Sequence, residues 1–179
     1  TAASTTAPAN SAAAAPAAAS TQVTVTTDTL KLVIDGSKVL RAQLLQYPQS
    51  RDPGAPPVEL FNQNPAQLYT AGLAWTSQGS AAPGPGAVFR PEQPQRDYVL
   101  ASGQDSLRIP FVWEGNGVRI VRTFTITRGA YLVGVSDQVT NTGSAPWTAV
   151  IYRQLERTPP PPVKGGITNP HAFSLVGAA

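Results

Sequence analysis

The sequence lacks cysteine entirely and contains a single histidine, His171, among its 179 residues. Without cysteine the chain can form no disulfide, thiolate nucleophile or cysteine-ligated metal site, a composition that is compatible with an oxidising compartment. One histidine with no carboxylate near it in the sequence also gives little material for a nucleophilic triad or a paired-histidine metal site. We therefore expect no catalytic, cofactor-binding or metal-binding residues, and we interpret His171 as a solvated loop side chain.

Charged residues and long apolar runs are also scarce. Charged residues make up 13% of the chain, against about a quarter in typical domains, and the 13 basic and 10 acidic residues are scattered along it. Nucleic-acid binding is not expected, because a phosphate footprint needs a concentrated patch of lysine and arginine. No segment approaches the roughly 20 apolar residues of a membrane helix, so we expect no membrane span in this chain.

The first 20 residues are almost entirely alanine, threonine, serine and proline, with no large apolar side chain. Ordering them would cost conformational entropy with no apolar burial to offset it, so we interpret residues 1–21 as a disordered tether. An alanine-rich helix is the alternative, and Pro8 and Pro16 disfavour it. Because neither an initiating methionine nor a signal-peptide pattern is visible, we expect the chain to be a piece of something larger.

Alternating apolar and polar residues between positions 106 and 140 are the strongest structural signal. This period of two predicts three half-buried antiparallel strands. Asn116-Gly117 joins the first two strands and suits a type I′ turn, which needs positive φ at both positions. Arg128-Gly129-Ala130 forms the next corner. The apolar positions are Leu107, Ile109, Phe111, Trp113, Val118, Ile120, Phe124, Ile126, Tyr131, Val133, Val135 and Val139.

Two charged residues, Arg122 and Asp137, fall on the apolar faces of neighbouring predicted strands. A lone charge on a buried face is costly, so we expect these two side chains to face each other as an ion pair. A structural pair is favoured here over a catalytic one.

The same alternation predicts further strands outside the meander, at residues 23–25, 30–34, 60–61, 68–75 and 148–155. Segment 39–47 fits a helix nearly as well as a strand. Proline, glycine and glutamine dominate three segments predicted to be loops, namely residues 48–57, 77–96 and the polyproline stretch 159–162. Residues 172–177 resemble an edge strand that stops without a cap.

Other candidate groups have a structural explanation that we favour. Gly103-Gln104-Asp105-Ser106-Leu107 differs from an esterase nucleophile block by the inserted Gln104. A glycosidase would need two carboxylates roughly 5–10 Å apart, and most acidic residues fall at predicted strand ends or turns. Phe111, Trp113, Phe124 and Tyr131 are assigned to the core, whereas three other aromatic residues could line a sugar or peptide cleft. They are Trp75, Trp147 and Tyr152.

Three segments carry a family resemblance. The main one runs from Thr123 through Tyr131 to Gly143, and it is preceded in order by segments 25–32 and 97–100. Over about residues 22–179 the chain resembles the periplasmic domain of the YidC membrane protein insertases, in strand and turn residues and not in a chemical signature.

The resemblance implies an all-β fold, an antiparallel β-supersandwich of the galactose mutarotase-like shape. It also favours a strand at 39–47. It implies that residues 22–179 are the first part of a periplasmic β-sandwich domain truncated at its C-terminal end, with residues 1–21 following a missing membrane helix. The resemblance also implies that the domain lies at the periplasmic face of the bacterial inner membrane.

The implied function is a non-enzymatic scaffold and interaction domain that assists membrane protein insertion, alone or with the Sec translocon. Plausible partners are the Sec translocon and its SecDF accessory complex, with nascent membrane proteins handled by the missing membrane region. No cofactor is implied, and the resemblance assigns no partner-binding residue. The alternatives are a carbohydrate-binding or mutarotase-like domain and a generic immunoglobulin-like adhesion or pilus module. Mutarotase chemistry needs an acid/base set that one histidine does not provide, whereas sugar binding by Trp75 or Trp147 stays open as a hypothesis. The ordered match over residues 22–179 disfavours the adhesion module.

Overall fold

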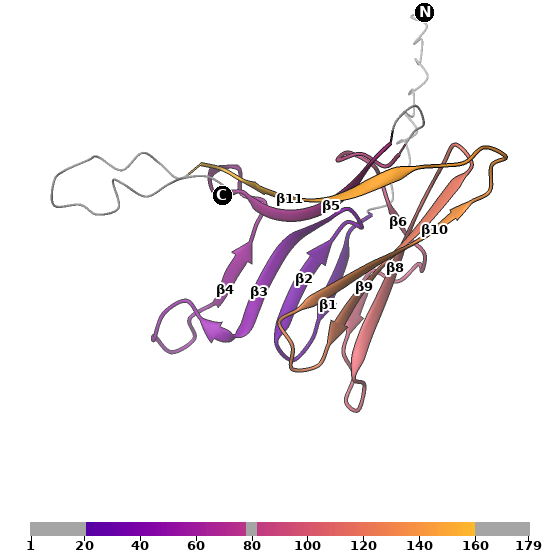
Figure 1. Ribbon diagram of the computed structural model, residues 1–179. Coiled ribbons are helices and arrows are strands. Elements are labelled where there is room, and N and C mark those ends of the chain that lie inside the picture. The colour runs from indigo at the N-terminus through magenta and orange to yellow at the C-terminus, as the bar shows by residue number, and fades with distance from the viewer. Residues whose placement is uncertain (1–20, 78–81, 160–179) are drawn as a thin grey trace, which may run out of the picture.

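The computed structural model describes residues 21–77 and 82–159, and its regular structure is β-strand apart from the 3₁₀ turn η1 (Pro65–Gln67) (Figure 1). The expected all-β sandwich is confirmed. The predictions for residues 1–20, for His171 and for segments 160–162 and 172–177 lie outside the described residues.

Seven strands form the larger sheet, in the order β11-β5-β3-β2-β1-β7, with β4 pairing beside β3. Their bounds are β1 (Val23–Thr26), β2 (Leu30–Ile34), β3 (Lys38–Pro48), β4 (Pro57–Phe61), β5 (Tyr69–Ser77), β7 (Asp97–Val99) and β11 (Ala149–Arg157). All these pairs are antiparallel except β1 with β7. Segment 39–47 is therefore a strand, because β2 pairs with it through Leu32 and Ala42.

Four strands form the smaller sheet, in the order β10-β9-β8-β6. They are β6 (Arg90–Pro91), β8 (Ser106–Gly115), β9 (Val118–Thr127) and β10 (Val133–Asn141). The turn between β8 and β9 has Asn116 at φ 49° and Gly117 at φ 75°, so the predicted type I′ geometry is confirmed. The three predicted strands pair as an antiparallel meander, with Ile109 opposite Phe124 and Val135 opposite Phe124 on the other side.

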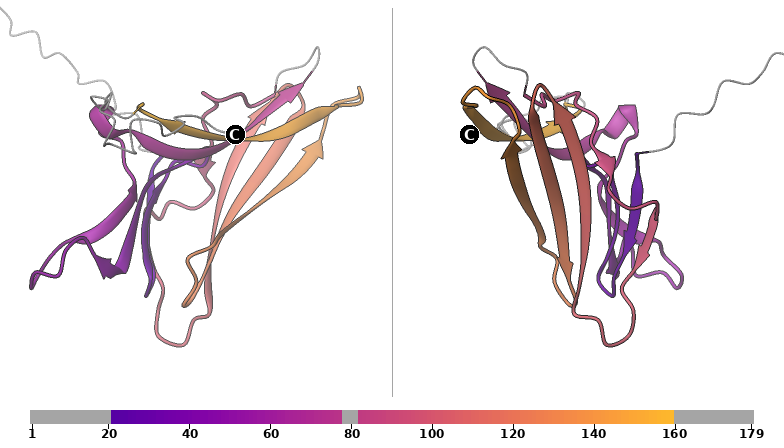
Figure 2. Two further views of the ribbon diagram at one scale, coloured as in Figure 1. Left: turned by 60° about the vertical axis from the view of Figure 1, so that its left-hand side comes forward. Right: turned by 90° about the vertical axis from the view of Figure 1, so that its right-hand side faces the viewer.

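The core lies between the two sheets, which Figure 2 shows as separate layers. Fully buried side chains from both layers meet there, among them Val23, Val25, Leu32 and Ile34 from one sheet and Ile109, Phe111, Ile120, Phe124 and Ile126 from the other. Strands β5 and β11 run across one end of the molecule, at a steep angle to β1–β4 (Figures 1 and 2).

Two sequence predictions about the core were wrong. Tyr131 is 43% exposed, because it lies before the first residue of β10, in the corner where the chain has not yet entered the sheet. Segment 77–96 was predicted to be a loop, but it contributes the short strand β6 and the core residue Phe89, which is only 1% exposed. Phe89 reaches the core because β6 pairs with β8 immediately after it.

Candidate functional site

The part of the chain that the structure describes contains no group of three or more histidine, cysteine or acidic residues that could hold a metal ion. None of its helical segments has the length and apolar character needed to cross a membrane. Most of the acidic side chains that the sequence offered as possible catalytic carboxylates form ion pairs with basic side chains. Glu114 accepts a hydrogen bond from Arg119 at 3.0 Å, and Glu156 accepts one from Lys38 at 2.6 Å.

The serine of the esterase-like segment has no catalytic surroundings. Ser106 is the first residue of β8, where it pairs with Thr127. The preceding residues make a turn in which Gly103 has φ +79° and the Gln104 amide donates to the Ala101 carbonyl. Asp105 uses its backbone carbonyl to accept from the Arg128 amide. This segment therefore closes one end of the β8–β9 hairpin.

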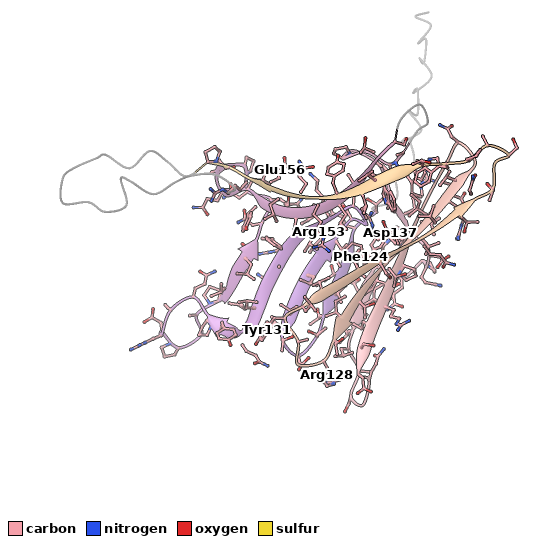
Figure 3. All side chains as sticks on the ribbon, in the orientation of Figure 1. Phe124, Arg128, Tyr131, Asp137, Arg153 and Glu156 are labelled. Atoms are coloured by element: carbon pink, nitrogen blue, oxygen red, sulfur yellow. The ribbon has the colours of Figure 1, made fainter. Side chains whose placement is uncertain are left out.

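Arg122 and Asp137 do form the predicted pair, and they are directly opposite each other in the β9–β10 register. Arg122 Nε donates to Asp137 Oδ1 at 2.7 Å, and Nη2 donates to Oδ2 at 2.6 Å, which is the bidentate geometry of a strong charge-assisted pair. The Arg122 side chain is fully buried, and that of Asp137 is 5% exposed. Figure 3 labels Asp137 beside Phe124, within the smaller sheet.

The pair also joins the two sheets. Arg122 Nη1 donates to the Leu73 carbonyl of β5 at 2.9 Å, and to the Gly36 carbonyl in the β2–β3 turn at 3.4 Å. The Trp75 indole donates to Asp137 Oδ2 at 2.8 Å, and the Arg122 guanidinium lies 4.6 Å from the centre of the Phe89 ring. We call Arg122, Asp137, Trp75 and Phe89 the buried arginine network. The polar side-chain atoms of this network are hydrogen-bonded, and the Arg122 and Asp137 side chains are almost completely shielded from solvent.

The sequence could suggest the ion pair but not its other partners. Trp75 lies 62 residues from Asp137, and Phe89 stands in a segment rich in proline and glycine. A large aromatic residue within such a segment was the only available signal for Phe89, since loop residues seldom need one without a packing role.

The tryptophans that might line a cleft are used mainly for packing. Trp75 and Trp147 pack at 5.7 Å between ring centres, tilted by 48°, and both contact the core. Trp75 and Tyr152 do line a shallow hollow of about 370 Å³. The indole nitrogen of Trp75 is already committed to Asp137, so it has no donor left for a sugar hydroxyl.

The opposite end of the sandwich is closed by turn-to-turn contacts. Both carboxylate oxygens of Asp28 accept from the Gly129 amide, at 3.1 and 3.0 Å, and the Thr29 hydroxyl donates to the Ala130 carbonyl at 2.7 Å. Beside them Tyr131 donates to Gln46 at 3.1 Å and lies 5.8 Å from the Tyr47 ring. Desolvation of the phenol, and secondarily the neighbouring Tyr47 and Asp28, raises the pKa of Tyr131 above its ordinary value of 10.0, although the residue is 43% exposed.

The inner surface of β5 and β11 is uncovered. Trp75 contacts Asp137 of the smaller sheet, so its side of β5 faces inward, and the antiparallel register places residues of β11 on the same side. We call this surface the open face. It consists of Tyr69, Leu73, Ile151, Arg153 and Leu155. Leu155 is 67% exposed, Ile151 41% and Tyr69 36%.

Comparison with known proteins identifies relatives over nearly the whole chain. A family model described as the YidC periplasmic domain matches residues 22–178. Three relatives are each named membrane protein insertase YidC. The protein from Stenotrophomonas maltophilia (strain R551-3) is 49% identical over 162 residues, which is 89% of this chain and 28% of the relative. The protein from Xanthomonas oryzae pv. oryzae (strain PXO99A) is 48% identical over 168 residues, 92% of this chain and 29% of the relative. The protein from Xylella fastidiosa (strain M23) is 43% identical over 158 residues, 87% of this chain and 28% of the relative. The chain thus spans less than a third of the length of these relatives.

Proposed function

This chain belongs to the YidC periplasmic domain family, and we propose on that basis that it is a scaffold and interaction domain of a membrane protein insertase. The observation that carries the proposal is the match of residues 22–178 to this family, together with relatives of up to 49% identity that are named insertases. The whole protein would help membrane proteins insert and fold, and this domain would lie on the periplasmic side of the inner membrane.

The domain would contribute contacts and not chemistry. Arg122 and Asp137 are buried against each other, and Glu114 and Glu156 are each paired with a basic side chain, which supports a non-enzymatic role. Residues 1–21 would serve as the tether from a preceding membrane helix, and residues 22–179 would form the first part of the periplasmic domain. We propose the Sec translocon and its SecDF accessory complex as partners, with membrane proteins as the substrates of the whole insertase.

The experiment is complementation with the full-length protein in bacteria depleted of their own insertase. We expect the unaltered protein to restore growth and insertion of a membrane-protein reporter. Failure of a well-expressed, membrane-located protein to do so would contradict the insertase assignment. Photo-crosslinkers at exposed positions such as Val99 and Arg108 should capture Sec components, and a lack of adducts from all exposed positions would overturn the partner part of the proposal.

The carbohydrate-binding alternative is not favoured by the comparisons, because the family model and the relatives described above are named for an insertase. The commitment of the Trp75 indole to Asp137 also counts against it. Titration with common hexoses should leave tryptophan fluorescence unchanged. A saturable change that disappears in a Tyr152→Ala variant would revive the alternative, because Tyr152 lines the hollow beside Trp75.

A further inference from the structure

We propose that Asn116 is a site of spontaneous deamidation, a covalent modification that converts it to aspartate or isoaspartate. The isoaspartate form breaks the contact between the β8–β9 turn and the loop that follows β10. Because the reaction needs only water and the turn itself, it does not depend on the proposed function.

Among the described asparagines, Asn116 alone has a side-chain amide that makes no hydrogen bond. The Oδ1 atoms of Asn62, Asn64 and Asn141 each accept from a backbone amide, at 3.0, 3.1 and 3.0 Å. Asn116 is exposed, and it is followed by Gly117, which has no side chain to hinder an approach to its amide nitrogen. The electrophile and the nucleophile of a deamidation are therefore both accessible at this turn.

The peptide group between Asn116 and Gly117 can turn over without breaking a hydrogen bond. Both residues lie beyond the last ladder pair, Gly115 with Val118, and the carbonyl and amide of this peptide bond to no other described group. Turning this peptide over converts the type I′ turn to type II′ and takes ψ of Asn116 from about +30° to about −120°. The Gly117 nitrogen then lies on the side of the Asn116 Cβ, where a succinimide ring can close.

The reaction balances with water as the only co-reactant. The Gly117 nitrogen loses its proton and attacks Asn116 Cγ, the Cγ–Nδ2 bond breaks, and Nδ2 leaves as ammonia with that proton. Water then opens the succinimide at one of its two carbonyl carbons. Attack at Cγ gives aspartate. Attack at the main-chain carbonyl carbon gives isoaspartate, whose backbone runs through Cβ and is longer by that atom. No oxidant or reductant is needed.

Gly117 connects the turn to the segment in which the chain crosses from the smaller sheet to the larger one. Its carbonyl accepts from the Thr142 amide at 2.6 Å, the Gly143 amide at 3.0 Å and the Thr142 hydroxyl at 2.9 Å. Figure 1 shows this turn beside the loop that follows β10. The extra backbone atom of isoaspartate displaces Gly117 from these donors. Aspartate keeps the backbone unchanged and adds only a charge.

Asp35-Gly36 provides a matched control within the chain, because aspartate before glycine forms the same succinimide. Asp35 Oδ1 accepts from the Ser37 amide at 2.9 Å, the Ser37 hydroxyl at 2.9 Å and the Lys38 amide at 2.7 Å. Succinimide formation at Asp35 would have to break these three hydrogen bonds. We therefore expect the native fold to protect Asp35 and to leave Asn116 reactive.

The test is peptide mapping by mass spectrometry of the full-length protein, aged at mildly alkaline pH in native and in denatured form. Deamidation is detected as the replacement of an amide nitrogen by oxygen, and isoaspartate is distinguished from aspartate by fragmentation. The native rate at Asn116 should lie within about threefold of the denatured rate, because no hydrogen bond has to break. The native rate at Asp35 should be lower than its denatured rate by about tenfold or more. Native protection of Asn116 as strong as that of Asp35 would overturn the proposal.

Two variants separate the charge from the change of backbone. Asn116→Gly removes the amide and retains a sequence that suits the same turn, so its peptide should show no mass gain, and a gain that persists would overturn the assignment. Freshly prepared Asn116→Asp supplies the aspartate product. Hydrogen exchange at the Thr142 and Gly143 amides should be about tenfold or more faster in the isoaspartate fraction than in either variant. Equal exchange in that fraction and in Asn116→Asp would overturn the proposed release of the loop.

Discussion

Arg122 carries a positive charge to a position with no exposure to solvent. The cost of removing it from water is offset by two hydrogen bonds to Asp137, by carbonyl oxygens of Leu73 and Gly36, and by the Phe89 ring. These contacts come from the smaller sheet, from β5, from the β2–β3 turn and from the segment before β6. One side chain therefore connects four parts of the fold that are distant in sequence.

Breaking this pair from either side should be costly. Arg122→Ala and Asp137→Ala should each lower the free energy of unfolding by about 3–5 kcal/mol, because each leaves a buried charge without its partner. The double variant should lose less than the sum of the two. Urea unfolding of the wild type, both single variants and the double variant completes the cycle, and strictly additive losses would contradict a direct pair.

Tyr131 gives a prediction about alkaline pH. Its pKa is raised above 10.0, so the folded state holds the phenol proton more tightly than the unfolded state does. The stabilising contribution of the neutral phenol is complete below pH 10 and is lost as the pH rises through the raised pKa.

Absorbance titration should resolve one tyrosinate that appears above pH 10 and is absent in Tyr131→Phe. The alkaline loss of stability should be smaller in that variant. A titration curve that the substitution leaves unchanged in shape would contradict the raised pKa.

At the scale of elements, turns decide how the strands meet. The β2–β3 turn needs Gly36, which has φ +86° and lies so close to the core that an added Cβ would be 2.6 Å from both Phe111 and Phe89. The same turn presents the carbonyl that Arg122 contacts. Glycine is therefore required at position 36 for two reasons: the left-handed backbone conformation, and the close approach of the Phe111 and Phe89 side chains.

Gly36→Ala should cost about 3 kcal/mol or more, from left-handed backbone strain plus overpacking of the core. Gly103→Ala is the matched control, because Gly103 has φ +79° but no atom within 4 Å of the added Cβ. It should cost only about 1–2 kcal/mol, the strain alone. Chemical denaturation measures the free energy of unfolding of both variants. Equal losses would show that the side chains around Gly36 accommodate the added methyl group at no energetic cost.

At the scale of the whole molecule, two sheets of unequal width leave the open face unpaired. β11 pairs only with β5 among the described strands, so both its free edge and its inner side chains are accessible. Accessible edges and apolar patches favour association between molecules. The 179-residue chain by itself should therefore be prone to aggregation.

Leu155→Ser should reduce that aggregation, measured by light scattering during concentration of the 179-residue chain. Since Leu155 is 67% exposed, stability should change by no more than about 0.5 kcal/mol. Val99→Ser removes a side chain of similar exposure from the other edge and should have a smaller effect. An equal effect of both changes would mean that general surface hydrophobicity, and not the open face, drives association.

The alternation of residues along the chain determined most of the strands, the type I′ turn at Asn116-Gly117, and the pairing of Arg122 with Asp137. Each depends on neighbours in sequence or on adjacent strands, where a period of two and a short turn leave one register possible. The relation to the insertases was likewise visible in strand and turn residues alone, and the family comparison supports it.

Contacts between segments far apart in the chain were decided only by the tertiary structure. They include the bond from Trp75 to Asp137, the burial of Phe89, the exposure of Tyr131 and the open face around Arg153. In these cases the residue type and its local pattern are compatible with either a buried or an exposed position. The choice depends on which layer lies opposite, and that is a property of the assembled sheets.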